Sequence, residues 1–118
     1  MQKNSSSFEQ GSIIIANILY SQQVGFKRRP VLAISNSDYN KHSEDLIVLS
    51  ISSTPAKAKY DVKLTNKDLD EGELRIESKI LVDFPTTIEK NLITQNIGKI
   101  SKQKLKEVKQ KIKELYEL

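Results

Sequence analysis

The chain has 118 residues, of which 37% are hydrophobic and 29% are charged, so one globular domain with its function on one surface is expected. Zero cysteines and a single histidine exclude disulfides, thiol catalysis and the usual zinc ligand sets, and no cofactor or metal is expected. A net charge of +4 is compatible with a polyanionic partner, and no apolar run reaches the length of a membrane span.

The first ten residues, MQKNSSSFEQ, are polar and have no apolar segment after their lysine. This pattern argues against a secretory signal, and it predicts a flexible polar leader over residues 1–7 followed by a single domain over residues 8–118. The expected location is the cytoplasm.

Short runs rich in Ile, Val and Leu, bounded by Gly, Ser, Asn, Asp and Pro, predict β-strands. Between the first two runs, the polar stretch 21–28 is expected to be a mobile loop because it contains Gly25. Residues 66–72 are expected to form a turn or a single helical turn that ends at Gly72. The predicted strands are residues 11–20, 29–36, 45–52, 59–65, 78–84 and 92–100.

Two adjacent arginines, Arg28 and Arg29, precede Pro30 where the predicted loop enters the second strand. Proline disfavours the α region for the residue before it, so Arg29 should be extended. Successive side chains of an extended chain point to opposite faces, and we therefore expect only one of the two arginines to face a given cleft. From these residues alone, two solvated charges on a loop remain the alternative.

The last eighteen residues predict an amphipathic helix whose apolar face packs on the core or on a second subunit. Ser101 is the predicted N-cap, and Ile100 is placed to pack against Leu105. The lysines are read as a solvated helix face. The apolar stripe consists of Leu105, Val108, Ile112 and Leu115, and the lysines are residues 102, 104, 106, 109, 111 and 113.

Five to seven strands and one late helix indicate a mainly β (α+β) fold, either a small bent antiparallel sheet or an open barrel. Such a sheet leaves little interior for a ligand cavity. A binding site is therefore expected on an outer face or in a groove between subunits.

The order of these features resembles the MazF/PemK family of toxin endoribonucleases over residues 8–118. The features are GSIIIANI, KRRPVLAISN, LIVLSIS, ILVDFPTTI and the final helix. The resemblance implies a small SH3-like barrel of the MazF/PemK/CcdB type, usually a homodimer. It also implies sequence-selective cleavage of single-stranded mRNA without metal, by attack of the 2′-hydroxyl, which leaves 2′,3′-cyclic phosphate and 5′-hydroxyl ends. The implied partner is an acidic, partly disordered antitoxin.

Carried over by position, the resemblance makes Arg29 the catalytic arginine, Ser52 its hydroxyl partner and Asp83 an acidic catalytic residue. Ser52 shares a strand face with Ser50, so an ordinary polar strand face is the alternative. Asp83 would otherwise pair with a lysine or cap the turn before Pro85.

Four further residues are predicted to bind RNA. Lys27 and Arg28 would contact phosphates, whereas Phe26 and Tyr20 would stack on unpaired bases or belong to the core. His42 is read as a surface loop residue.

Three positions depart from the family pattern. Ser52 replaces the usual threonine and loses the methyl group that restricts its rotamers, Thr86 replaces a second arginine, and Leu81 replaces a basic residue. These departures keep an alternative open, namely a non-catalytic module on the same fold that binds nucleic acid or inhibits gyrase.

Overall fold

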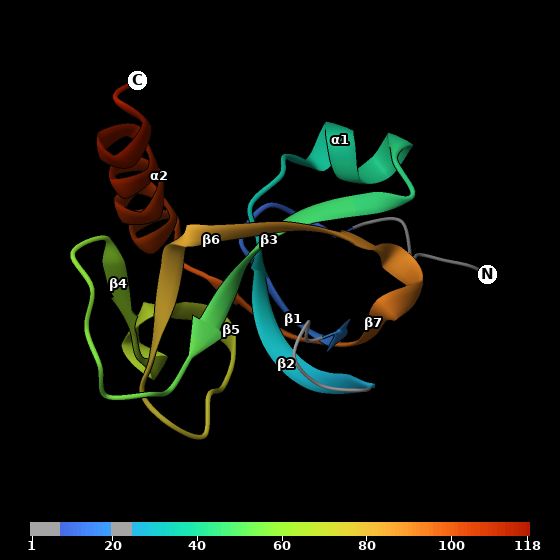
Figure 1. The fold of residues 1–118 in the computed structure, drawn as a ribbon, viewed down its shortest axis with the longest axis horizontal. Coiled ribbons are helices and arrows are strands. Elements are labelled where there is room, and N and C mark those ends of the chain that lie inside the picture. Colours follow the sequence, from blue (N-terminus) through green and yellow to red (C-terminus); the bar gives the residue numbers. More distant parts are fainter. Residues whose placement is uncertain (1–7, 20–24) are drawn as a thin grey trace.

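The computed structural model describes residues 8–19 and 25–118. These residues form one antiparallel sheet of seven strands with two α-helices, drawn in Figure 1. The strands follow the spatial order β4-β6-β3-β2-β1-β7-β5, and the sheet does not close, because β4 and β5 remain at its two edges. The predicted fold class is confirmed in its open form.

The strands are β1 (Ser12–Leu19), β2 (Phe26–Ala33), β3 (Asp45–Ser52), β4 (Asp61–Leu64), β5 (Leu69–Gly72), β6 (Ser78–Glu89) and β7 (Ile93–Ile100). The helices are α1 (Ser37–His42) and α2 (Lys102–Tyr116), and two short 3₁₀ turns span Asn66–Asp68 and Lys90–Leu92. All six predicted strands and the predicted C-terminal helix are present.

Three predictions about local structure were wrong. Residues 26–28 were placed in a mobile loop, but β2 already begins at Phe26 and pairs with β1 from that residue onward. Residues 69–72 form a strand rather than the end of a turn, because they pair with β7. His42 ends the short helix α1, which begins after Asn36, whose side chain accepts a hydrogen bond from the Tyr39 amide at 2.8 Å.

The α2 helix lies against β4 and β6 at one end of the molecule, as Figure 1 shows. Its N-cap is Ser101, as predicted, because the Ser101 hydroxyl accepts a hydrogen bond from the Lys104 amide at 3.1 Å. Val108 is fully buried in the larger core cluster, and Leu105, Ile112 and Leu115 pack against that cluster. The apolar stripe of α2 therefore packs on the core of its own chain.

The long strand β6 bends where its pairing with β3 is interrupted. The partner of Leu49 is Pro85, whereas the partner of the next residue, Ser50, is Leu81. The residues between those two partners form a bulge, which bends a strand and increases its twist. The bulge lies beside the site described below, which Leu81, Phe84 and Thr86 help to line.

Within the described residues, no helix combines the length and the apolar character that crossing a membrane requires.

Candidate functional site

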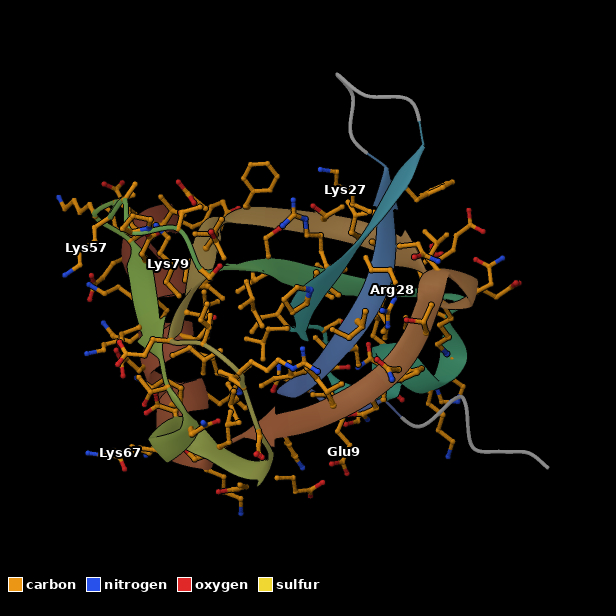
Figure 2. All side chains as sticks on the ribbon, turned by 90° about the horizontal axis from the view of Figure 1, so that it is seen from below. Glu9, Lys27, Arg28, Lys57, Lys67 and Lys79 are labelled. Carbon is orange, nitrogen blue, oxygen red and sulfur yellow. The ribbon has the colours of Figure 1, made fainter. Side chains whose placement is uncertain are left out.

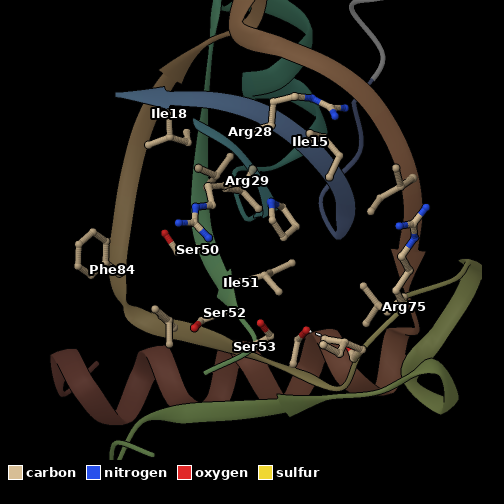
Figure 3. A pocket seen from close by; sticks show the side chains of 18 of the residues that line it. Ile15, Ile18, Arg28, Arg29, Ser50, Ile51, Ser52, Ser53, Arg75 and Phe84 are labelled. Atoms are coloured by element: carbon tan, nitrogen blue, oxygen red, sulfur yellow. Dashed lines mark hydrogen bonds between the residues drawn. The ribbon is translucent and has the colours of Figure 1, made fainter. Parts of the chain in front are cut away.

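An open groove of about 910 Å³ lies on the concave side of the bent sheet, and Figure 3 shows it from close by. Residues from β1, β2, β3, β6 and β7 line it, together with the segment 73–76 that connects β5 to β6. The sequence predicted little interior space and a site on an outer face or between subunits, and this open groove lies on a face of the sheet of a single chain. Leu81, Phe84 and Thr86, which lie at or beside the bulge in β6, contribute to the lining of the groove.

The groove gathers every arginine of the sequence. Arg28 and Arg29 enter it from β2, and Arg75 enters it from the connecting segment. No lysine of the described residues lines it. Figure 2 shows Lys57 and Lys67 pointing outward from the molecule.

Arg28 and Arg29 point in different directions, but both line the groove (Figure 3). Arg28 donates a hydrogen bond from Nη2 to Oε1 of Gln95 on β7, at 3.0 Å. The Arg29 guanidinium lies toward Ser50 on β3 in Figure 3. The expectation that only one of the two arginines would face a given cleft was therefore wrong. The groove is wide enough for Arg28, which points toward β7, and Arg29, which points toward β3, both to line it.

The backbone of Arg29 is held by β1, just before β2 also begins to pair with β3. It pairs with the fully buried Ala16 of β1, and two residues later Val31, which is also buried, pairs with Ser50 of β3. The pairing of β2 therefore fixes the backbone position from which the exposed Arg29 side chain extends.

Hydroxyl groups of β3 and the following residues form the floor of the groove. Ser50, Ser52, Ser53 and Thr54 all line it, and Ser50 and Ser52 share one strand face, as predicted. The Ser52 hydroxyl lies 3.1 Å from the Thr54 hydroxyl and accepts a hydrogen bond from the Thr54 amide at 3.2 Å. These contacts orient Ser52, although it lacks the methyl group of threonine.

The other predicted site residues lie elsewhere. Asp83 is exposed on β6 and is not among the lining residues, although its neighbour Phe84 is. Lys27 and Phe26 are exposed on β2 outside the lining. Tyr20 falls outside the described residues.

Sequence reasoning missed Arg75, Glu73 and Phe84 as groove residues. Phe84 is 59% exposed, which is unusual for an aromatic residue in a predicted strand. The sequence contained a partial signal for Arg75, because it is a lone arginine in a polar stretch before a predicted strand. It did not indicate that this segment would fold back to line the groove.

Among the described residues, no group of three or more His, Asp or Glu side chains is arranged to hold a metal ion. The groove instead offers guanidinium groups and hydroxyls. Together these can hold an anion with several oxygens, because a guanidinium donates paired hydrogen bonds and stays charged.

Comparison with known proteins gives a family and a fold. Residues 9–116 match the model of a family described as "PemK-like, MazF-like toxin of type II toxin-antitoxin system". A curated relative, endoribonuclease MazF of Staphylococcus saprophyticus, is 32% identical over 90 residues, which cover 75% of this chain and 71% of the relative.

Solved structures with low sequence identity share the fold. An endoribonuclease from a mycobacterial species, solved in complex with its cognate antitoxin, is 15% identical and has a TM-score of 0.76, with 95% of this chain and 97% of that chain covered. The MazE–MazF complex of Deinococcus radiodurans is 20% identical and has a TM-score of 0.76, with 93% of this chain and 96% of that chain covered.

Proposed function

The chain belongs to the family of PemK-like, MazF-like toxins of type II toxin–antitoxin systems, and on this basis we propose that it is an endoribonuclease that cleaves single-stranded RNA. The observation that carries the proposal is the position of Arg29 beside the hydroxyl-lined floor of β3 in one open groove. The chemistry of this groove suits a phosphodiester backbone, whose oxygens accept hydrogen bonds from guanidinium groups.

The proposed reaction balances without an added reactant. The 2′-oxygen of the nucleotide before the scissile bond bonds to phosphorus, and the bond from phosphorus to the 5′-oxygen breaks. The 2′-hydroxyl loses a proton and the leaving 5′-oxygen gains one, so the products are a 2′,3′-cyclic phosphate and a 5′-hydroxyl. Negative charge builds on the phosphoryl oxygens in the transition state, where Arg29 would stabilise it.

Ser52 would position the substrate or share its proton with a phosphoryl oxygen, because Thr54 fixes its hydroxyl near the floor of the groove. The catalytic role of Asp83 stays a prediction, since this carboxylate lies outside the groove lining. Comparing Asp83→Asn with wild type in single-turnover cleavage measures that role directly.

The test uses the purified full chain and a long single-stranded RNA in the presence of EDTA. Cleavage with 2′,3′-cyclic phosphate ends, absent in a matched Arg29→Ala preparation, is the expected result. Intact RNA at high protein concentration would contradict the proposal. RNA binding without turnover would favour the non-catalytic alternative, which draws support from the uncharged Thr86 in the groove lining.

The proposed partners are a second copy of the chain and an antitoxin. An acidic, partly disordered antitoxin segment would be attracted to the arginine-lined groove and would cover Arg29 on binding. A co-expressed antitoxin that left the cleavage rate unchanged would contradict this mode of inhibition. A monomeric mass in light scattering at micromolar concentration would contradict the homodimer. The proposed action on cellular RNA requires the predicted cytoplasmic location, where that RNA is found.

A further inference from the structure

We infer that Arg75, on the wall of the groove opposite Arg29, binds a second backbone phosphate of the RNA. This inference rests on the proposed function. It gives the groove two anchoring points for the strand, one on β2 and one on the segment that connects β5 to β6, as Figure 3 illustrates.

The first argument is the separation of arginine from lysine. All three arginines line the groove, and none of the described lysines does. If positive charge alone were required for solubility, the more numerous lysines would be expected there as well. Arginine differs from lysine in its planar fork, which matches two oxygens of one phosphate, so this distribution indicates phosphate recognition.

The second argument is that Arg75 has no polar partner among the residues that the structure describes. Within residues 8–19 and 25–118, its guanidinium forms no ion pair and no hydrogen bond. Glu73 is the single carboxylate among the described residues that line the groove, and it does not pair with Arg75. The side chain is exposed, so its charge is available to a ligand.

The third argument is that the backbone around Arg75 is fixed. Leu74 packs against the larger core cluster, and its amide and carbonyl both bond to the Asn66 side chain, at 2.6 and 3.1 Å. Arg75 follows directly, so the point from which its side chain extends is set by the core.

A close approach between β5 and β7 fixes the preceding residues. Gly72 pairs with Gly98, and a Cβ atom added to Gly72 would lie 1.9 Å from the carbonyl oxygen of Ile97. Gly72 also has a φ of +83°, a value that residues with side chains rarely adopt. The glycine therefore allows the chain to leave β5 in the direction that carries Arg75 into the groove.

The groove also has apolar surface suited to bases. Ile76 and Phe84, which both line it, are 58% and 59% exposed. Unpaired bases stack on aromatic rings such as that of Phe84 and make apolar contacts with side chains such as Ile76, while their phosphates bind cationic groups. The combination of guanidinium groups and exposed apolar side chains in one groove fits a single strand with several nucleotides bound.

The first experiment measures the affinity for a single-stranded RNA as a function of salt concentration, in an Arg29→Ala background that keeps the RNA intact. Adding Arg75→Ala should weaken binding about tenfold and flatten the log–log salt slope by about 0.7, the value for one lost phosphate contact. The matched control is Lys67→Ala, which removes an exposed cation outside the groove lining.

The second experiment locates the contact. In a series of oligonucleotides, one phosphate at a time is replaced by an uncharged methylphosphonate, and binding is measured with and without Arg75→Ala. At one position, the replacement should weaken binding to the protein that retains Arg75 and leave the Arg75→Ala protein unaffected. Additive losses at every position would overturn the inference.

The outcomes separate this inference from the proposed function. If the protein that retains Arg75 binds RNA and Arg75→Ala binds equally well, Arg75 is not a phosphate ligand, although the proposed function stands. If no form binds RNA, both fail. A change in oligomeric mass on Arg75→Ala would also overturn the inference, because it would assign the side chain to a subunit contact. Arg75→Gln serves as a second variant that removes the charge but keeps a polar side chain. Its thermal unfolding midpoint should match that of wild type, which shows that any loss of binding is not a loss of fold.

Discussion

Two groups of positively charged residues in this protein, the lysines of α2 and the arginines of the groove, have different surroundings. On α2, two of the lysines form ion pairs with nearby carboxylates. Lys104 contacts Asp68 at 3.5 Å and Glu107 at 2.8 Å and is only 12% exposed, so it departs from the predicted solvated face, and Lys111 contacts Glu114 at 3.6 Å. In the groove, arginines from β2 and from the segment 73–76 face hydroxyl groups and exposed apolar side chains.

This difference shows why net charge alone does not locate a function. The lysines of α2 are explained by the amphipathic pattern of the helix. Its solvent-facing side requires polar residues, while its apolar stripe packs on the core. The arginines stand on rigid backbone beside a concave surface, and their fork geometry suits phosphate. We therefore expect substitutions in the groove to change activity, whereas substitutions on α2 should change stability or nothing.

The largest effect is expected for Arg29→Ala. Removing a donor aimed at the charge that develops in the transition state costs about 2.7–4 kcal/mol, or roughly a hundred- to a thousandfold in rate. Single-turnover cleavage measures the loss, and thermal unfolding should be near wild type because the side chain is exposed. A tenfold loss or less would place Arg29 among general binding charges.

The next effect concerns stability rather than activity. Val108 is fully buried between α2 and the sheet, and Val108→Ala removes apolar volume worth about 1.5 kcal/mol of unfolding free energy at about 0.8 kcal/mol per buried CH₂. Denaturant unfolding measures it, with the exposed Lys109→Ala on the same helix as control. Cleavage by the folded fraction should be unchanged for both variants, and a specific loss of activity in Lys109→Ala would break the contrast between the two regions.

A smaller effect on binding is expected for Arg28→Ala. Its guanidinium is already held by Gln95, so it should contribute one phosphate contact and little to the chemical step. The salt dependence of RNA affinity should flatten by about 0.7 in log–log slope, with the maximal single-turnover rate nearly kept. Equal losses of rate at positions 28 and 29 would mean that the pair is a general basic patch.

The smallest effect is expected at an ion pair outside the groove. The hydrogen bond that Lys99 donates to Glu9 raises the pKa of the Lys99 ammonium above its usual value of 10.5. A raised pKa means that the stabilisation is fully present below about pH 10.5 and is lost as pH rises through the folded-state value.

Because both side chains are partly exposed, Glu9→Gln should lower the unfolding free energy by less than about 1 kcal/mol at pH 7. Unfolding curves of wild type and Glu9→Gln should converge above pH 10.5. A difference that grew with pH would contradict the assignment.

Local sequence signals predicted much of the fold. The apolar run 45–52 matches β3, and the Ser101 cap and the stripe through Val108 predicted α2, because periodicity and capping act over a few residues. The six residues of α1 were too few to show a helical period. Strand β5 was missed because its pairing depends on the close approach of Gly72 to β7, which is a long-range contact.

The same division holds for the candidate site. Arg29 and Ser52 lie on predicted strands, and their order along the chain pointed to them before the structure did. Arg75 lines the groove directly after Leu74, whose position is set by long-range contacts with Asn66 and the core. The bulge opposite Leu49 and Ser50, beside which the groove lies, was indicated by no local pattern.

The most direct test of this account is single-turnover cleavage of single-stranded RNA by Arg29→Lys beside wild type. Lysine keeps the positive charge but lacks the planar guanidinium fork. The variant therefore separates the effect of paired hydrogen bonds to phosphate from the effect of charge attraction alone. We predict that Arg29→Lys stays folded, binds RNA and remains mostly inactive. Cleavage at the wild-type rate would contradict the claim that arginine geometry in the groove, rather than its charge, is what the function requires.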